Sequence, residues 1–125
     1  MESIIISLNG SQQILRAQQF MESNLVREIT MDDLARRSGM STRNFDRRFR
    51  AAVGEAPSSY LQKLRVEKAK RLLEITNDGV AEIMVKVGYQ DERSFRRLFH
   101  ALTELSPRAY RRRYASQGVW PPGRS

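Results

Sequence analysis

The spacing of apolar residues predicts a chain built only of α-helices. In two segments, residues 11–26 and 57–76, apolar side chains recur every three or four positions, so each segment can present one apolar face as a helix. The apolar positions are Ile14, Ala17, Met21 and Leu25 in the first segment, and Tyr60, Leu61, Leu64, Ala69, Leu72 and Leu73 in the second. Pro57 suits the first position of a helix, and Asn77-Asp78-Gly79 predicts the turn that follows.

The sequence also repeats itself with a period of about fifty residues. Fifty positions apart stand the identical pairs Phe45 and Phe95, Arg47 and Arg97, Phe49 and Phe99, Ala51 and Ala101, Pro57 and Pro107, and Tyr60 and Tyr110. Upstream the offset falls to 49, since Leu34 matches Ile83 and Gly39 matches Gly88. One copy is therefore one residue longer in a short turn, and the chain is expected to contain two copies of one unit.

Each copy has the pattern of a short helix, a glycine turn and a second, amphipathic helix. Thr30 and Ser41 are expected to cap the two helices of the first copy, and Asp91 the second helix of the second copy. This succession is that of a helix-turn-helix unit. The expected inward-facing residues are Leu34, Ala35, Phe45, Phe49 and Val53 in the first copy, and Val80, Ile83, Val87, Phe95, Leu98, Phe99 and Leu102 in the second.

The charge of the chain is concentrated in these two copies. Its 22 Lys and Arg residues exceed its 14 Asp and Glu residues, which gives a net charge of +8, and 18 of the cations are arginines. Residues 36–50 contain six arginines and one acid, and residues 91–113 contain seven arginines and three acids. Two basic segments on a nearly neutral remainder predict a polyanionic partner that is contacted at two places. The alternative is two solvated helix faces.

Four arginines are the first candidates for reading DNA bases. Burying the phenylalanine pairs turns Arg43, Arg47, Arg93 and Arg97 outward on the second helix of each copy, the helix that enters the major groove. A guanidinium can bind O6 and N7 of guanine with two hydrogen bonds. Contact with phosphate or simple solvation are the alternatives. Thr42, Arg50 and His100, on the same faces, are expected to contact the DNA backbone.

Two carboxylates on these faces are unexpected, because they repel phosphate. Asp46 and Glu92 could each accept a hydrogen bond from N4 of cytosine. The favoured interpretation is that Asp46 pairs with Arg43 or Arg50 in its own helix, and that Glu92 favours the helix N-terminus.

Further backbone contacts are predicted where helices begin or carry additional arginines. Two helices are expected to start beside Pro57 and Pro107, where free amides could hold a phosphate. The candidate residues there are Ser58, Ser59 and Arg108, together with Arg111 and Arg112 in the basic run that follows.

Composition and motifs exclude several other function classes. The chain has no cysteine and a single histidine, His100, without a catalytic partner at a suggestive spacing. It has no glycine-rich phosphate loop, no metal-ligand cluster and no apolar run near the ~20 residues that a membrane helix needs. We therefore expect no enzymatic activity, no cofactor, no metal and no membrane partner, and a cytoplasmic location.

Four spaced stretches resemble the C-terminal DNA-binding domain of AraC/XylS-type bacterial transcription regulators. They are Leu34-Ala35 with Gly39-Met40-Ser41 and Phe45-Asp46-Arg47-Arg48-Phe49; Gly54 with Pro57, Tyr60 and Leu61; Arg65 with Ala69, Leu72 and Leu73; and Ile83 with Val87-Gly88-Tyr89, Asp91, Phe95-Arg96-Arg97-Leu98-Phe99, Ser106-Pro107 and Tyr110-Arg111. The resemblance covers about residues 11–114. The stretch from Ser94 to Tyr114 is most similar to the branch with an amidotransferase-like N-terminal domain.

The resemblance implies seven helices, with two helix-turn-helix units joined by a long linking helix. It implies two recognition helices in successive major-groove segments of a non-palindromic, double-stranded operator, and a regulator, most simply an activator, that contacts RNA polymerase. Its base-reading positions correspond here to Arg43, Asp46 and Arg47, and to Glu92, Arg93, Arg96 and Arg97. Glu104 stands where the family's second copy usually has glycine, which would alter the turn into the last helix.

The expected division of the chain follows from these units. It comprises a linker or added residues at 1–10, a first helix-turn-helix unit at 11–56, the linking helix at 57–76, a second unit at 77–116 and a disordered tail at 117–125. Ile4-Ile5-Ile6 suggests a β-like segment at the start. The length leaves no room for the N-terminal effector or dimerisation domain of most family members, so such a domain is expected to be missing. An adaptor for an acidic protein and a non-specific nucleic-acid binder remain as alternatives. In a bacterial cell the bound protein would lie on the nucleoid.

Overall fold

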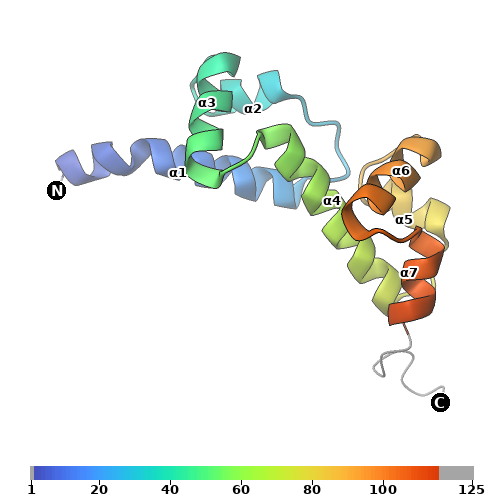
Figure 1. Cartoon of the computed structure of the whole chain (residues 1–125). Helices are drawn as coiled ribbons and strands as arrows, with labels where there is room; N and C mark the ends of the chain where they lie inside the picture. Colours follow the sequence, from blue (N-terminus) through green and yellow to red (C-terminus); the bar gives the residue numbers. More distant parts are fainter. Residues whose placement is uncertain (1, 116–125) are drawn as a thin grey trace. The chain divides into compact units, whose positions relative to one another are not determined.

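The computed structural model describes the backbone of residues 2–115 and the side chains of residues 12–115. The described backbone contains seven α-helices and no strand, which confirms the all-helical prediction (Figure 1). The helices are α1 (Glu2–Ser23), α2 (Met31–Arg37), α3 (Thr42–Val53), α4 (Pro57–Ile75), α5 (Val80–Lys86), α6 (Glu92–Thr103) and α7 (Pro107–Tyr114). The tail predicted at 117–125 lies outside the described residues.

The chain forms two compact units whose boundary falls inside α4. The first unit extends to Leu61 and holds α1, α2, α3 and the first residues of α4. The second begins at Gln62 and holds the rest of α4 with α5, α6 and α7. The segment predicted as a separate linking helix at 57–76 is therefore a continuous helix to Ile75, and both units use part of it.

The core of the first unit lies where α1 and α2 pack against α3. Phe45 and Phe49 of α3 are fully buried, with ring centroids 5.7 Å apart, and Phe49 meets the edge of Tyr60 on α4 at 5.5 Å. The remaining buried apolar residues of this unit are Ile14, Ala17, Met21, Leu25, Leu34, Ala35 and Leu61. The predicted apolar face of the leading helix is thus confirmed.

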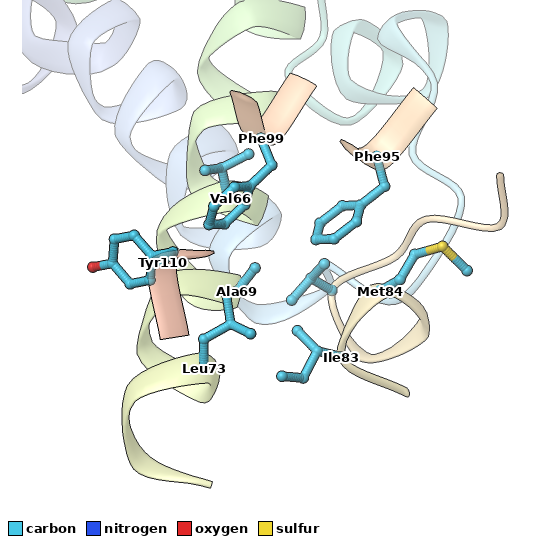
Figure 2. Packing of buried hydrophobic residues seen from close by; sticks show 9 residues of the cluster. Val66, Ala69, Leu73, Ile83, Met84, Phe95, Phe99 and Tyr110 are labelled. Atoms are coloured by element: carbon cyan, nitrogen blue, oxygen red, sulfur yellow. The ribbon is translucent and has the colours of Figure 1, made fainter. Parts of the chain in front are cut away.

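The second unit repeats this core with the equivalent phenylalanines. Phe95 and Phe99 are fully buried with centroids 5.9 Å apart, and Phe99 meets the edge of Tyr110 at 5.6 Å. Figure 2 shows their side chains directed toward residues of α4 and α5. The other buried members of this cluster are Val66, Ala69, Leu73, Ile83, Met84 and Val87.

Three details of the predicted cores differ from the structure. Leu102, expected to face inward, is 42% exposed. Leu105, beyond the end of α6, packs against the cluster, while Leu102 does not. Val66 and Met84 are buried although neither was expected among the inward-facing residues. Packing against several neighbouring helices decides these positions, and a period counted along one helix does not contain that information.

The start of the chain also differs from the prediction. Residues 4–6 were expected to be β-like, but the backbone is helical from Glu2, and α1 continues to Ser23. The preference of isoleucine for strands is weak, and neighbouring helical turns override it. After Ser23, the side-chain amide of Asn24 donates to the carbonyl of Phe20 at 2.8 Å and closes the last turn.

The turn before α7 keeps the geometry of its counterpart despite the loss of glycine. Gly54 ends α3 in the left-handed conformation, with φ 95° and ψ 0°. Glu104 ends α6 in the same region, with φ 65° and ψ 14°, and is the single non-glycine residue with positive φ in the described chain. The expected alteration of the turn is therefore not observed, and Pro57 and Pro107 start their helices at equivalent places.

Candidate nucleic-acid interface

Two helix-turn-helix units are formed by α2 with α3 and by α5 with α6. The predicted caps are confirmed: Thr30 Oγ1 accepts from the amide of Asp33 at 3.0 Å, and Ser41 Oγ from that of Asn44 at 3.1 Å. Asp91 Oδ2 accepts from the amide of Ser94 at 3.1 Å. These bonds with Ser94 hold the pKa of Asp91 below its usual range, because they favour the charged form of the carboxylate.

The outer face of α3 carries a row of exposed cations. Burial of its phenylalanines leaves Thr42, Arg43, Arg47 and Arg50 exposed. Asp46 lies half-buried among them and its Oδ2 accepts from Arg50 Nε at 2.8 Å. Pairing of this carboxylate within its own helix, the favoured interpretation, is thus confirmed. Because Asp46 offsets the charge of Arg50, the surface beside Arg43 and Arg47 is less positively charged than Arg50 alone would make it.

One contact on α3 was not expected from the sequence. Arg47 Nη2 donates to the side-chain oxygen of Asn44 at 2.7 Å. Arg43, one turn away from Arg47, forms no hydrogen bond or ion pair through its guanidinium within residues 12–115. The two arginines predicted to read bases in the first unit therefore differ in how firmly they are held.

The outer face of α6 has the same kinds of residue in a different order. Arg93, Arg97 and His100 are exposed, and the side chains of these three make no hydrogen bond or ion pair in the described part of the chain. Arg96 Nε donates to Glu92 Oε2 at 2.7 Å. Glu92 therefore pairs with an arginine of its own helix in addition to lying in the first turn, where a carboxylate is favourable.

The remaining predicted contact residues lie on α4 and α7. Ser58 and Ser59 are exposed in the first turn of α4, and Arg108 and Arg112 are exposed on α7. Arg111 has another environment. Its Nε donates to the carbonyl of Leu73 at 3.1 Å and its Nη2 to that of Thr76 at 3.0 Å, so it closes the C-terminal end of α4 rather than projecting into solvent.

A second contact between α4 and α7 could not be predicted from the sequence either. The hydroxyl of Tyr110 donates to Glu74 Oε2, and burial together with this carboxylate raises the pKa of Tyr110 far above its usual value. The partners are 36 residues apart and no local spacing indicates them. The contact between Asn44 and Arg47, by contrast, has the i, i+3 spacing of neighbours on a helix and could have been found.

The described residues offer neither a metal site nor a membrane span. No group of three or more His, Cys, Asp or Glu side chains is placed to hold a metal ion among the residues with described side chains. No described helix is both long enough and apolar enough to cross a membrane.

Comparison with known proteins places these units in a family. A family model described as a helix-turn-helix domain matches residues 34–113. The crystal structure of a regulator with an AraC-type DNA-binding domain, from Chromobacterium violaceum, superimposes with a TM-score of 0.78 at 30% identity, covering 87% of this chain and 98% of that one. The chain belongs to the AraC-type helix-turn-helix family. This family is a class of DNA-binding transcription regulators, not a class of enzymes.

Two further relatives of this AraC-type domain carry informative descriptions. The DNA-binding domain of the global transcriptional factor AdpA, solved in complex with a target DNA, gives a TM-score of 0.80 at 33% identity and covers 84% of this chain and 95% of that one. The transcriptional activator AarP of Providencia stuartii is 33% identical over 92 residues, which are 74% of this chain and 68% of AarP.

The lengths of the relatives differ widely. The regulator Rv1931c of Mycobacterium tuberculosis is 41% identical over 83 residues, which are 66% of this chain but 32% of that protein. The AraC-type domain described here thus corresponds to about a third of some relatives and to about two thirds of others.

Proposed function

We propose that this domain binds double-stranded DNA in a sequence-specific manner and activates transcription. In this proposal α3 and α6 occupy two successive major-groove segments of a non-palindromic operator. The observation that carries the proposal is the pair of helices with identical buried phenylalanines and exposed arginines on the opposite face. The DNA complex of AdpA supports DNA as the partner.

The two unlike outer faces support an operator with two unlike halves. On α3 the carboxylate Asp46 holds Arg50, whereas on α6 the carboxylate Glu92 holds Arg96 one turn earlier in the helix. The arginines left to face DNA occupy equivalent positions on the two helices, Arg43 with Arg93 and Arg47 with Arg97, so the two faces differ in the paired residues that lie beside these arginines. Two copies of one unit that differ in this way are expected to prefer different base pairs.

We assign two classes of contact within this proposal. Arg43, Arg47, Arg93 and Arg97 read base edges, while Asp46, Glu92 and Arg96 shape the same faces through their pairs. Backbone contacts come from Thr42, Arg50, Ser58, Ser59, His100, Arg108 and Arg112. Arg111, predicted for this class, is engaged with α4 and is proposed to act on stability.

Further parts of the proposal rest on the relatives. AarP is described as a transcriptional activator, which supports activation as the direction of regulation. A contact with RNA polymerase remains a prediction. The protein would act in the cytoplasm, on the nucleoid, without a cofactor and without catalysis. An N-terminal effector or dimerisation domain, of amidotransferase-like or another type, remains a prediction.

The experiment that tests this proposal is selection from a randomised duplex library at near-physiological salt. We expect two unlike subsites, about 10 base pairs apart, to be enriched together. Tight, salt-sensitive binding without any enriched sequence would instead indicate non-specific coating of nucleic acid. Weak binding to every duplex would contradict the proposal and leave an acidic protein as the alternative partner.

A further inference from the structure

We infer that Asn44 is a positioning residue that fixes Arg47 for base reading, so that the first unit discriminates bases with a prearranged guanidinium and the second with a free one. This inference rests on the proposed function, because it concerns how the same interface selects its sequence. Its basis is the bond of Arg47 Nη2 to the side-chain oxygen of Asn44 at 2.7 Å.

The internal repeat provides the comparison that isolates this contact. Helices α3 and α6 both have 12 residues, and both begin after a side-chain cap. The two phenylalanine pairs have nearly equal centroid separations, 5.7 and 5.9 Å, and the same interplanar angle of 51°. Because the helix lengths and the phenylalanine pairs match, we attribute the difference between Arg47 and Arg97 to the residues beside them on the outer faces.

The residue beside Arg97 does not hold this arginine as Asn44 holds Arg47. Position 44 corresponds to Ser94 in the second copy, and the hydroxyl of Ser94 donates to Asp91. This bond turns the hydroxyl toward the cap of its own helix, and among the described residues Ser94 forms no bond with Arg97. Arg97 is exposed and its guanidinium makes no hydrogen bond or ion pair with any described residue. Of these two equivalent arginines, Arg47 is thus hydrogen-bonded to a neighbouring side chain and Arg97 is not.

Holding an arginine before binding has a physical consequence for recognition. A long side chain loses rotamer freedom when it docks on a guanine, and this loss opposes binding. A bond to Asn44 removes part of that loss in advance and limits the directions in which the guanidinium can point. Arg47 should therefore distinguish guanine from other bases more strictly than Arg97 does.

The neighbouring charges do not compete for Arg47. Asp46 is engaged by Arg50 at 2.8 Å. The amide oxygen of Asn44 is a neutral acceptor, so it directs the guanidinium without neutralising its charge. Asn44 itself is half-buried at the start of the helix, where its backbone amide is bonded to Ser41.

The first test needs no DNA. The side-chain Nε–H signals of the arginines are measured by NMR in the free protein, in the unsubstituted chain and in Asn44→Ala and Asn44→Ser. We expect the Arg47 guanidinium to be more ordered than that of Arg97, and to lose this order in both variants. Equal mobility of the two arginines in the unsubstituted chain would overturn the inference whatever the protein binds.

The second test measures discrimination on the selected operator. Each base pair is substituted in turn, and the pair read by Arg47 is identified by its loss of discrimination in Arg47→Ala. We expect Asn44→Ala to lower discrimination at that pair alone by about twofold to tenfold, the range of one net hydrogen bond. In the Arg47→Ala background the same substitution should have no further effect. Ser94→Ala, the matched control, should leave the pair read by Arg97 unchanged.

The outcomes separate this inference from the proposed function. Absence of any base preference in the unsubstituted chain would contradict the proposed function. Full discrimination in Asn44→Ala, with preference intact elsewhere, would contradict the role of Asn44 alone. A further loss in the Arg47→Ala background would mean that Asn44 contacts DNA itself, which also overturns a positioning role.

Discussion

Single arginines on the outer faces differ chiefly in their partners. Arg50 and Arg96 are held by carboxylates and Arg47 by a neutral amide. Exposed ion pairs of this kind contribute about 0–1 kcal/mol to stability, so they are not what holds the fold together. These pairs instead orient the guanidinium groups. A carboxylate partner also reduces the positive charge that its arginine presents to phosphate.

Glu104 is the residue where local strain is clearest. It adopts a φ of 65°, a region that costs a residue with a Cβ atom roughly 1–2 kcal/mol. Glycine avoids that cost but loses about 0.5–1 kcal/mol more in chain entropy on folding. Glu104→Gly is therefore expected to raise the free energy of unfolding by about 0.5–1 kcal/mol, measured by urea denaturation.

The matched control for this prediction is Gly54→Ala at the equivalent turn. A Cβ atom at Gly54 would meet no other atom within 4 Å, so its cost is confined to the backbone. We expect a loss of about 1 kcal/mol, opposite in sign to the gain at Glu104. If both substitutions left the unfolding curve unchanged, strain at this turn would not be a term in stability.

At the scale of elements, α7 is fastened to the end of α4 by two side chains. Arg111 bonds the carbonyls of Leu73 and Thr76, and Tyr110 bonds Glu74. Carbonyls in the last turn of a helix have no partner within that helix, so Arg111 satisfies groups that would otherwise need water. The basic run that begins at Arg111 thus contains one arginine that stabilises the contact with α4, Arg111, and one that is exposed to solvent, Arg112.

Arg111 and its neighbour Arg112 form a matched pair for testing this division. Arg111→Ala is expected to lower the free energy of unfolding by about 1–2 kcal/mol, because two partly exposed charged hydrogen bonds are lost. Arg112→Ala should leave stability within about 0.5 kcal/mol and reduce the slope of log affinity against log salt by about 0.9. If Arg111→Ala lowered the salt slope and left stability unchanged, the result would support the original prediction that Arg111 contacts phosphate.

The sequence was sufficient for most helices because their ends carry local signals. Caps at Thr30, Ser41 and Asp91 bond amides three residues ahead, and this spacing is readable without a structure. The repeat then doubled the evidence for each unit, since Phe45 and Phe49 recur as Phe95 and Phe99 with the same burial.

The failures have a common physical cause. Leu102 is exposed and Val66 is buried because of which neighbouring helix covers each face, and that is decided by contacts distant in sequence. The same holds for Arg111 with Leu73, 38 residues away. The placement of the base-reading side chains on DNA is likewise beyond a sequence pattern, and those assignments stay predictions.

For the whole molecule, the net charge of +8 is less informative than its distribution. Six arginines fall within residues 36–50 and seven within residues 91–113. The acids in these segments are committed mainly to caps and to arginines of their own helix, as with Asp91 and with Glu92. The cations without such partners remain available to a polyanion, and long-range attraction to DNA should therefore weaken steeply with salt.

The residues of α4 belong to two cores, so the amides of one helix report separately on two units. The amides of Tyr60 and Leu61 donate to carbonyls of the first unit, and the amide of Leu73 donates to a carbonyl of the second. Hydrogen–deuterium exchange at Tyr60 and Leu61 should therefore follow the opening of the first unit, and exchange at Leu73 that of the second. Added urea that accelerates exchange at one of these places before the other would identify the less stable unit, whereas one common rate at all three amides would show that the two units open together.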